Sequence, residues 1–166
     1  MKSQLEIKFI NEITLNQGII HKICRIYTDN KDDHEDLFQE ITIQLWRSSG
    51  NFRGEAKFST WMYRIALNTA ISLFRRNKKE ISVNSDIDIS TIKISQSEKE
   101  EKEERIKIMY QAIHQLSDIE KALIMLFLED KSYREIGEIL GISEGNARVK
   151  MNRARNNLKT LISKIK

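Results

Sequence analysis

The feature that most constrains the fold lies in the last third of the chain, between residues 133 and 158. An apolar pattern with helical spacing runs from Tyr133 to Leu140 and meets Gly141, and a second helical pattern starts at Ser143. Glycine often ends a helix in the left-handed conformation, and serine is a favoured N-terminal cap. The segment therefore predicts two helices that meet at a tight turn.

The second of these helices is strongly basic, because it contains no acidic residue after Glu144. At about 100° per residue, one of its sides is apolar and is predicted to pack inward. That side consists of Ala147, Met151, Ala154 and Leu158. A basic helix that follows a tight turn is typical of the helix-turn-helix, whose second helix lies in the major groove of DNA.

The outward side of this helix predicts contacts with DNA, the alternative being an ordinary solvated basic face. Residues of the first two turns are placed to reach base edges, where Arg148 or Lys150 would donate to guanine and Val149 would contact a thymine methyl. Arg153 and Arg155 lie further along and are expected to hold phosphates. The predicted DNA-binding residues are Ser143, Glu144, Asn146, Arg148, Val149, Lys150, Asn152, Arg153 and Arg155.

An acidic stretch, residues 81–104, separates two basic segments of this chain, whose formal net charge is +4. Its first part alternates isoleucine with serine or aspartate, but no partner strand is predicted elsewhere. We interpret it as a flexible linker, and its acidic end could instead begin the next helix. With no proline among 166 residues, the prediction is an all-α protein. It has two small helical domains, residues 1–80 and 105–166, the second of which contains the helix-turn-helix.

The helical pattern also predicts the core of each domain. The first domain is predicted to begin with one or two helices over residues 5–27. A helix capped by Asp32 or Asp33 follows, and then another from Ser59 or Thr60 to about Arg76. Their predicted core is Ile13, Ile19, Ile20, Ile23, Ile26, Leu37, Phe38, Ile41, Leu45, Met62, Ala66, Thr69, Ala70 and Leu73. In the second domain Asp118 is expected to cap a helix. The predicted core of this domain is Ile106, Met109, Tyr110, Ile113, Leu116, Ala122, Leu123, Met125, Leu126 and Leu128.

A polar, basic strip with a tryptophan runs along the helix predicted from residue 60 to 76. Aromatic side chains stack on unpaired bases and cations follow the backbone, so this strip predicts binding of single-stranded nucleic acid. The alternative is that Trp61 covers a neighbouring helix with only its edge exposed. With the loop before the helix, the predicted residues are Phe52, Arg53, Lys57, Phe58, Trp61, Arg64, Asn68, Ser72, Arg75 and Arg76.

Together these motifs resemble those of bacterial RNA polymerase sigma factors of the extracytoplasmic-function (ECF) subfamily. Residues 33–46 resemble the helix that binds core polymerase. Residues 52–70 resemble the loop and helix that melt and read the minus-ten element. Residues 116–120 and 133–155 resemble the domain that reads the minus-thirty-five element. The resemblance implies that Asp36, Gln39, Glu40 and Trp46 bind the polymerase. The implied partners are the beta-prime and beta subunits of core polymerase, promoter DNA and an anti-sigma factor.

The sequence also bears on other classes of function. A stand-alone helix-turn-helix regulator remains the alternative, and it would bind duplex DNA tightly without polymerase. An enzyme is not expected, because His21, His34 and His114 are scattered and no phosphate-binding glycine loop accompanies them. Cys24 is the only cysteine, so no disulfide and no cysteine-based metal site is predicted. No cofactor and no other metal site are expected. Without a long apolar run or a signal peptide, the chain is expected to be cytoplasmic, with no membrane insertion.

Overall fold

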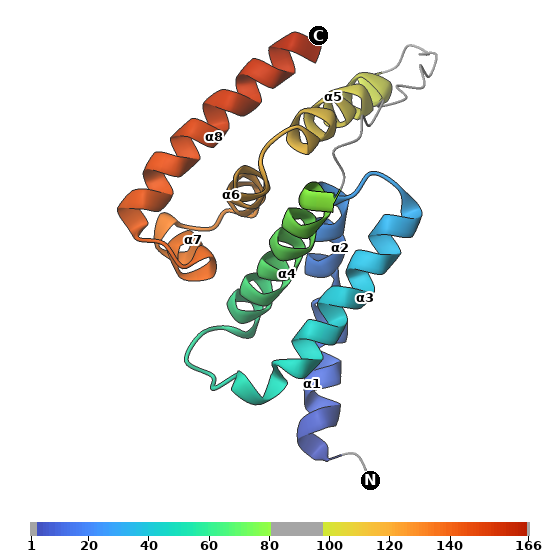
Figure 1. Ribbon diagram of the computed structural model, residues 1–166, viewed down its shortest axis with the longest axis vertical. Coiled ribbons are helices and arrows are strands. Elements are labelled where there is room, and N and C mark those ends of the chain that lie inside the picture. The colour runs from blue at the N-terminus through green and yellow to red at the C-terminus, as the bar shows by residue number, and fades with distance from the viewer. Residues whose placement is uncertain (1–2, 81–97, 166) are drawn as a thin grey trace.

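The computed structural model describes residues 3–80 and 98–165, which form eight α-helices and one short 3-10 helix (Figure 1). The first half contains α1 (Gln4–Leu15), α2 (Gln17–Tyr27), α3 (Lys31–Arg47), the 3-10 helix η1 (Ser49–Asn51) and α4 (Phe58–Glu80). The second half contains α5 (Glu98–His114), α6 (Asp118–Leu128), α7 (Tyr133–Leu140) and α8 (Glu144–Ile165). No strand occurs within these ranges, and the all-α prediction is confirmed.

Side-chain caps set the helix starts, in places one to three residues from the predicted positions. Asn30, not Asp32 or Asp33, caps α3: its Oδ1 accepts a 2.8 Å hydrogen bond from the Asp33 N–H. The two aspartates then fall in the first turn, where the helix dipole favours negative charge. Ser117, not Asp118, caps α6, because its Oγ accepts from the Glu120 N–H at 3.3 Å.

In the first unit, α2, α3 and α4 pack around a common core. Most predicted core residues are buried there, among them Ile20, Ile23, Leu37, Ile41 and Leu45. Met62, Ala66 and Ala70 of α4 face the same core, whereas Ile13, Ile19, Phe38 and Leu73 are only partly buried at its edge. The helical period thus identified the inward faces correctly.

In the second unit, α8 packs against α5, α6 and α7. Ala147, Met151 and Ala154 are buried, as the pattern predicted. Two predicted core residues are wrong: Ile106 is 43% exposed and Leu128 is 49% exposed. Ile106 belongs to the first half of α5, where residues 99–107 all lie outside the core. Leu128 ends α6, beside the turn that leads to α7.

The two units share one continuous hydrophobic core. α6 lies between α8 on one side and α2 and α4 on the other (Figure 1), and all six residues from Lys121 to Leu126 are buried. A helix that is buried all round must be covered from both sides. Residues 81–97 of the predicted linker lie outside the described residues. The acidic end of the linker is helical, because α5 begins at Glu98.

Candidate nucleic-acid and polymerase interfaces

The turn between α7 and α8 is built by specific backbone contacts. Ser132 and Glu135 form a reciprocal cap at the start of α7, with hydrogen bonds of 2.9 and 3.1 Å. The Ser132 N–H and the nearby cations lower the pKa of the Glu135 carboxyl. Gly141 ends the helix in the left-handed conformation (φ 72°), which glycine adopts without strain. These contacts fix the angle at which α8 leaves the turn.

Gly137 allows the two helices of this motif to approach closely. A Cβ built on Gly137 would lie 2.6 Å from the carbonyl oxygen of Ile142, and the Gly137 carbonyl accepts from the N–H groups of Gly141 and Ile142. No side chain fits at that distance without moving backbone. Gly141 predicted the turn, whereas Gly137 was not predicted to have a role, although a glycine inside a short helix pattern is itself a signal of close packing.

The outer face of α8 presents the predicted DNA-binding residues to solvent. Ser143 caps the helix, since its Oγ accepts from the Asn146 N–H at 3.1 Å. The exposed members are Glu144, Asn146, Arg148, Val149, Asn152 and Arg153, whereas Lys150 and Arg155 are partly buried. The structure therefore brings these side chains onto one continuous surface.

Two arginines of this surface are oriented by neighbours within the unit. The Arg148 guanidinium lies 5.0 Å from the Tyr133 ring centroid and 3.7 Å from the Glu144 carboxylate. The Arg155 guanidinium lies 4.8 Å from the Phe127 ring centroid. Cation–π contacts hold such side chains along the protein surface, so Arg148 stands close to α7 and Arg155 leans toward α6.

A second exposed face runs along α4. Arg64, Asn68, Ser72 and Arg75 are exposed at helical spacing, as the wheel projection predicted. Arg76 lies in the part of α4 whose side chains are not described. In the preceding loop Arg53 and Lys57 are exposed, and Gly54 has a φ of 74°. The α4 strip and the loop thus form a polar, basic surface that is separate from α8.

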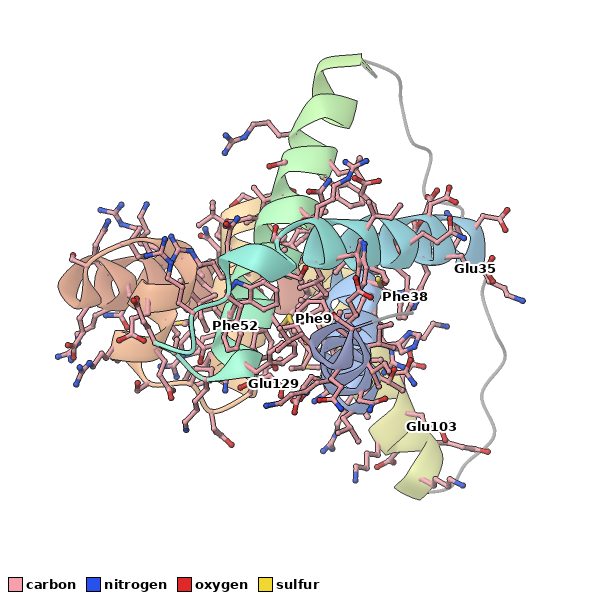
Figure 2. The ribbon with its side chains drawn as sticks, turned by 90° about the horizontal axis from the view of Figure 1, so that it is seen from below. Phe9, Glu35, Phe38, Phe52, Glu103 and Glu129 are labelled. Atoms are coloured by element: carbon pink, nitrogen blue, oxygen red, sulfur yellow. The ribbon has the colours of Figure 1, made fainter. Side chains whose placement is uncertain are left out.

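Trp61 stands at one end of this strip, within an aromatic cluster. Its ring centroid lies 5.2 Å from Phe52, 5.4 Å from Phe58 and 5.7 Å from Phe9. In Figure 2, which views the molecule from below, Phe9 and Phe52 are labelled near the middle of the view. The ring of Trp61 is partly buried, which agrees with the alternative that it covers neighbouring side chains. Phe9 was not predicted to belong to this surface, because it lies in α1, outside the segments that resemble those of sigma factors.

Two cavities adjoin these faces. One of about 360 Å³ lies between α3 and α4 and is lined by Glu40, Gln44, Asn68 and Ser72 among others. One predicted polymerase-binding residue and two predicted DNA-binding residues thus line the same cavity. Another, of about 540 Å³, lies between α1 and the loop and is lined by Phe9, Trp46, Phe52 and Phe58 among others.

The predicted polymerase-binding residues share one side of α3. Asp36 and Gln39 are exposed, and Trp46 is 45% exposed near the end of the helix. Glu40 is partly buried and accepts a 3.1 Å hydrogen bond from the Gln44 side-chain amide. Side chains three and four residues apart are neighbours on a helix, so Asp36, Gln39 and Glu40 form one acidic patch.

The three histidines are less scattered than predicted. His21 Nδ1 and His34 Nε2 are 3.1 Å apart, and the His21 ring stacks on Phe38 at 4.6 Å. Partial burial, followed by the nearby His21 and Arg25, lowers the pKa of His34. Among the described residues, no three side chains of the metal-ligating types stand together. The pair packs α2 against α3.

Comparison with known proteins agrees with this architecture. The family model "Sigma-70 region 2" matches residues 13–80, and "Sigma-70, region 4" matches residues 106–158. The ECF RNA polymerase sigma-E factor of Haemophilus influenzae is 31% identical over 80% of this chain and 76% of its own length. RNA polymerase sigma factor YlaC of Bacillus subtilis is 32% identical over 89% of this chain and 87% of its own.

Solved structures show the same fold. The sigma factor RpoE of Bartonella quintana, in complex with the anti-sigma factor NepR, superposes with a TM-score of 0.69 at 21% identity, over 94% of this chain and 97% of that chain. The matches to region 2 and region 4 define the class of protein: it is a sigma-70 transcription initiation factor. This chain belongs to the ECF subfamily of RNA polymerase sigma factors. None of the helices in residues 3–80 or 98–165 has the length and hydrophobicity needed to cross a membrane.

Proposed function

We infer that the first unit, residues 1–80, docks on core polymerase and reads and melts the minus-ten element, and that the second, residues 105–166, reads the minus-thirty-five element. Residues 81–104 connect them, with their acidic end in α5. The observation that carries this inference is the presence of three distinct faces in one chain: the acidic side of α3 and the basic faces of α4 and α8. An acidic face requires a basic partner, which DNA is not.

Docking is assigned to Asp36, Gln39, Glu40 and Trp46 on α3. Three of them project into solvent, while Glu40 lines the cavity that continues toward Asn68 and Ser72 of α4. A polymerase element bound to the acidic patch would therefore lie next to the α4 strip. This proximity supports a role in which polymerase docking and minus-ten reading are performed by adjoining surfaces of the first unit.

Melting is assigned to the loop, the aromatic cluster and the α4 strip. Taking a base out of the duplex costs a few kcal/mol, and stacking on an aromatic side chain returns about 1–3 kcal/mol per base. Phe52, Phe58 and Trp61 supply such rings beside Arg53 and Lys57, which attract the backbone. The first unit can thus stabilise an opened strand without hydrolysing a nucleotide.

The promoter preference of the second unit is assigned to the start of α8. Replacing Arg148 with alanine should reduce discrimination at one base pair of the upstream element by about 1–3 kcal/mol. Replacing Arg153 should instead weaken binding about equally on all sequences, because phosphate contacts carry no sequence information. In-vitro transcription from a library of upstream elements measures both, with Lys150→Ala tested in parallel. Unchanged preference in both Arg148→Ala and Lys150→Ala would refute the assignment.

An anti-sigma partner is part of the proposal. A relative of the same fold was solved with such a partner, and an inhibitor of this chain would need to cover its basic faces. Charge complementarity predicts an acidic inhibitor surface opposite α4 and α8.

The deciding experiment is run-off transcription with core polymerase on fragments of genomic DNA. A sigma factor gives defined start sites that depend on adding the chain, and binds isolated duplex weakly. The alternative, a stand-alone helix-turn-helix regulator, would bind a duplex site tightly by itself and would add no start-site selection to core polymerase. That second outcome would overturn the proposed function.

A further inference from the structure

A tyrosine at the start of α7 lies against an arginine of α8. Tyr133 is the first residue of α7, and its ring centroid is 5.0 Å from the guanidinium carbon of Arg148. A cation within about 6 Å of a ring centroid is attracted by the negative face of the ring. Tyr133 is partly buried and packs on the hydrophobic core, whereas Arg148 is exposed. The ring is therefore the fixed partner of this pair, and the arginine is the movable one.

The turn between α7 and α8 determines where this ring stands. Tyr133 directly follows Ser132, whose reciprocal cap with Glu135 fixes the first turn of α7. Gly137 then allows the two helices to approach closely. The position of the Tyr133 ring beside α8 thus follows from the backbone of the turn and not from the arginine.

Stacking on a ring leaves the hydrogen-bonding groups of an arginine available. The five N–H donors of a guanidinium lie in its plane, and guanine accepts two of them at O6 and N7. Glu144, one turn before Arg148, does not occupy them, because its Oε1 is 3.7 Å from Arg148 Nη2, beyond hydrogen-bonding distance. Both side chains of that ion pair are more than half exposed, so the pair is weak. Tyr133 thus restrains Arg148 without using the donors that a base requires.

The same helix carries a second stacked arginine in a different place. Arg155 lies seven residues after Arg148, hence on the same side of α8 and about 10 Å further along it. Its guanidinium carbon is 4.8 Å from the ring centroid of Phe127, near the end of α6. In a helix-turn-helix the N-terminal residues of the second helix reach base edges, and more distant cations contact phosphates. The two pairs therefore have similar geometry but different expected roles.

We propose that Tyr133 is a positioning residue for Arg148, and that it makes this arginine a reader of base edges. An exposed arginine without such a support has many rotamers, and the phosphates of DNA compete with the bases for it. Holding the guanidinium against α7 removes much of that freedom before DNA binds. Tyr133 then determines how strongly the chain prefers one base pair of the upstream element. This inference rests on the proposed role of Arg148 and deepens it.

In-vitro transcription tests the proposal, with core polymerase, the full chain and a library of promoters randomised in the upstream element. The Arg148→Ala variant first identifies the base pair that Arg148 reads, as the position where the preference falls by about fivefold or more. Tyr133→Leu keeps an apolar side chain on the core but removes the ring. Tyr133→Phe keeps the ring and removes only the hydroxyl.

Tyr133→Leu should lower the preference at that same base pair by about two- to fivefold, which corresponds to the loss of an exposed cation–π contact. Tyr133→Phe should retain the preference of the unmodified chain. In the Arg148→Ala background, Tyr133→Leu should change the preference no further, because the arginine that it positions is gone. Urea unfolding of each variant verifies that the chain stays folded.

Phe127→Leu is the matched control. It makes the same kind of change at the ring beside Arg155, outside the turns that reach base edges. It should lower transcription about equally from all upstream elements, by up to about fivefold, and should leave the base preference unchanged.

The outcomes separate this proposal from the one on which it rests. An unchanged base preference in Arg148→Ala refutes the role of Arg148 in the proposed function and, with it, the positioning role. If Arg148→Ala alters the preference and Tyr133→Leu does not, only the positioning role is overturned. A loss of transcription in Tyr133→Leu that is equal on all sequences shows a structural role and also overturns it. So do equal losses of preference in Tyr133→Phe and Tyr133→Leu, because the hydroxyl and not the ring is then responsible.

Discussion

Replacing Gly137 with alanine should destabilise the chain by about 1–3 kcal/mol, the usual cost of forcing an extra group into a packed interior. The added Cβ would lie 2.6 Å from the Ile142 carbonyl oxygen, so the backbone between α7 and α8 must move. The gain in helix propensity, about 1 kcal/mol, does not offset such a clash. Urea unfolding followed by circular dichroism measures the loss, and upstream DNA binding should fall with it.

Gly145→Ala is the matched control for this change. It is the same substitution in the same motif, in the first turn of α8, and no atom lies within 4 Å of the added Cβ. It should leave the free energy of unfolding unchanged or raise it by up to about 1 kcal/mol. If both variants unfolded at the same urea concentration, close packing of Gly137 would not be a requirement of this turn.

Reversing the acidic patch, with Asp36→Lys and Glu40→Lys together, should abolish co-purification with core polymerase. Placing like charges opposite each other costs several kcal/mol at an interface, which corresponds to a loss of at least about 100-fold in affinity. The fold should be retained, because Asp36 is exposed and the Glu40 carboxylate accepts its hydrogen bond from Gln44 of the same helix. Quantitative pull-down with purified core polymerase measures the effect.

The control variant carries the same change in charge at a distance from α3. Glu103 and Glu104 are exposed on α5, and Figure 2 shows Glu103 near the end of that helix. Glu103→Lys with Glu104→Lys should bind polymerase as the unmodified chain does. Equal loss in both double variants would mean that overall charge, not the α3 patch, governs binding. Full retention in the Asp36, Glu40 variant would refute the docking face.

The faces of individual helices could be predicted from the sequence, because helical periodicity reports which side chains share a side. Ala147, Met151 and Ala154 of α8 are buried as that pattern required. Periodicity does not report how far a neighbouring helix extends. Ile106 therefore has the right spacing for the core but lies in a part of α5 that projects beyond it.

The packing of one unit against the other was not predicted, although the sequence contains its signal. Tyr63, Leu67 and Ile71 form a stripe beside the predicted inward strip of α4, and residues 122–128 of α6 are all apolar. Each pattern indicates that a helix is buried on two sides, but neither pattern indicates which element packs against it. Similarly, Trp61 belongs by spacing to the polar strip, but its ring also contacts Phe9 and Phe52, which come from other segments, and Phe58 of its own helix.

The two-sided burial of α6 makes this helix part of a core that both units share. Its inner side would place apolar atoms in water if nothing replaced α2 and α4, at a cost of about 25 cal/mol for each Å² exposed. α6 therefore stabilises both units, not only the one that contains it.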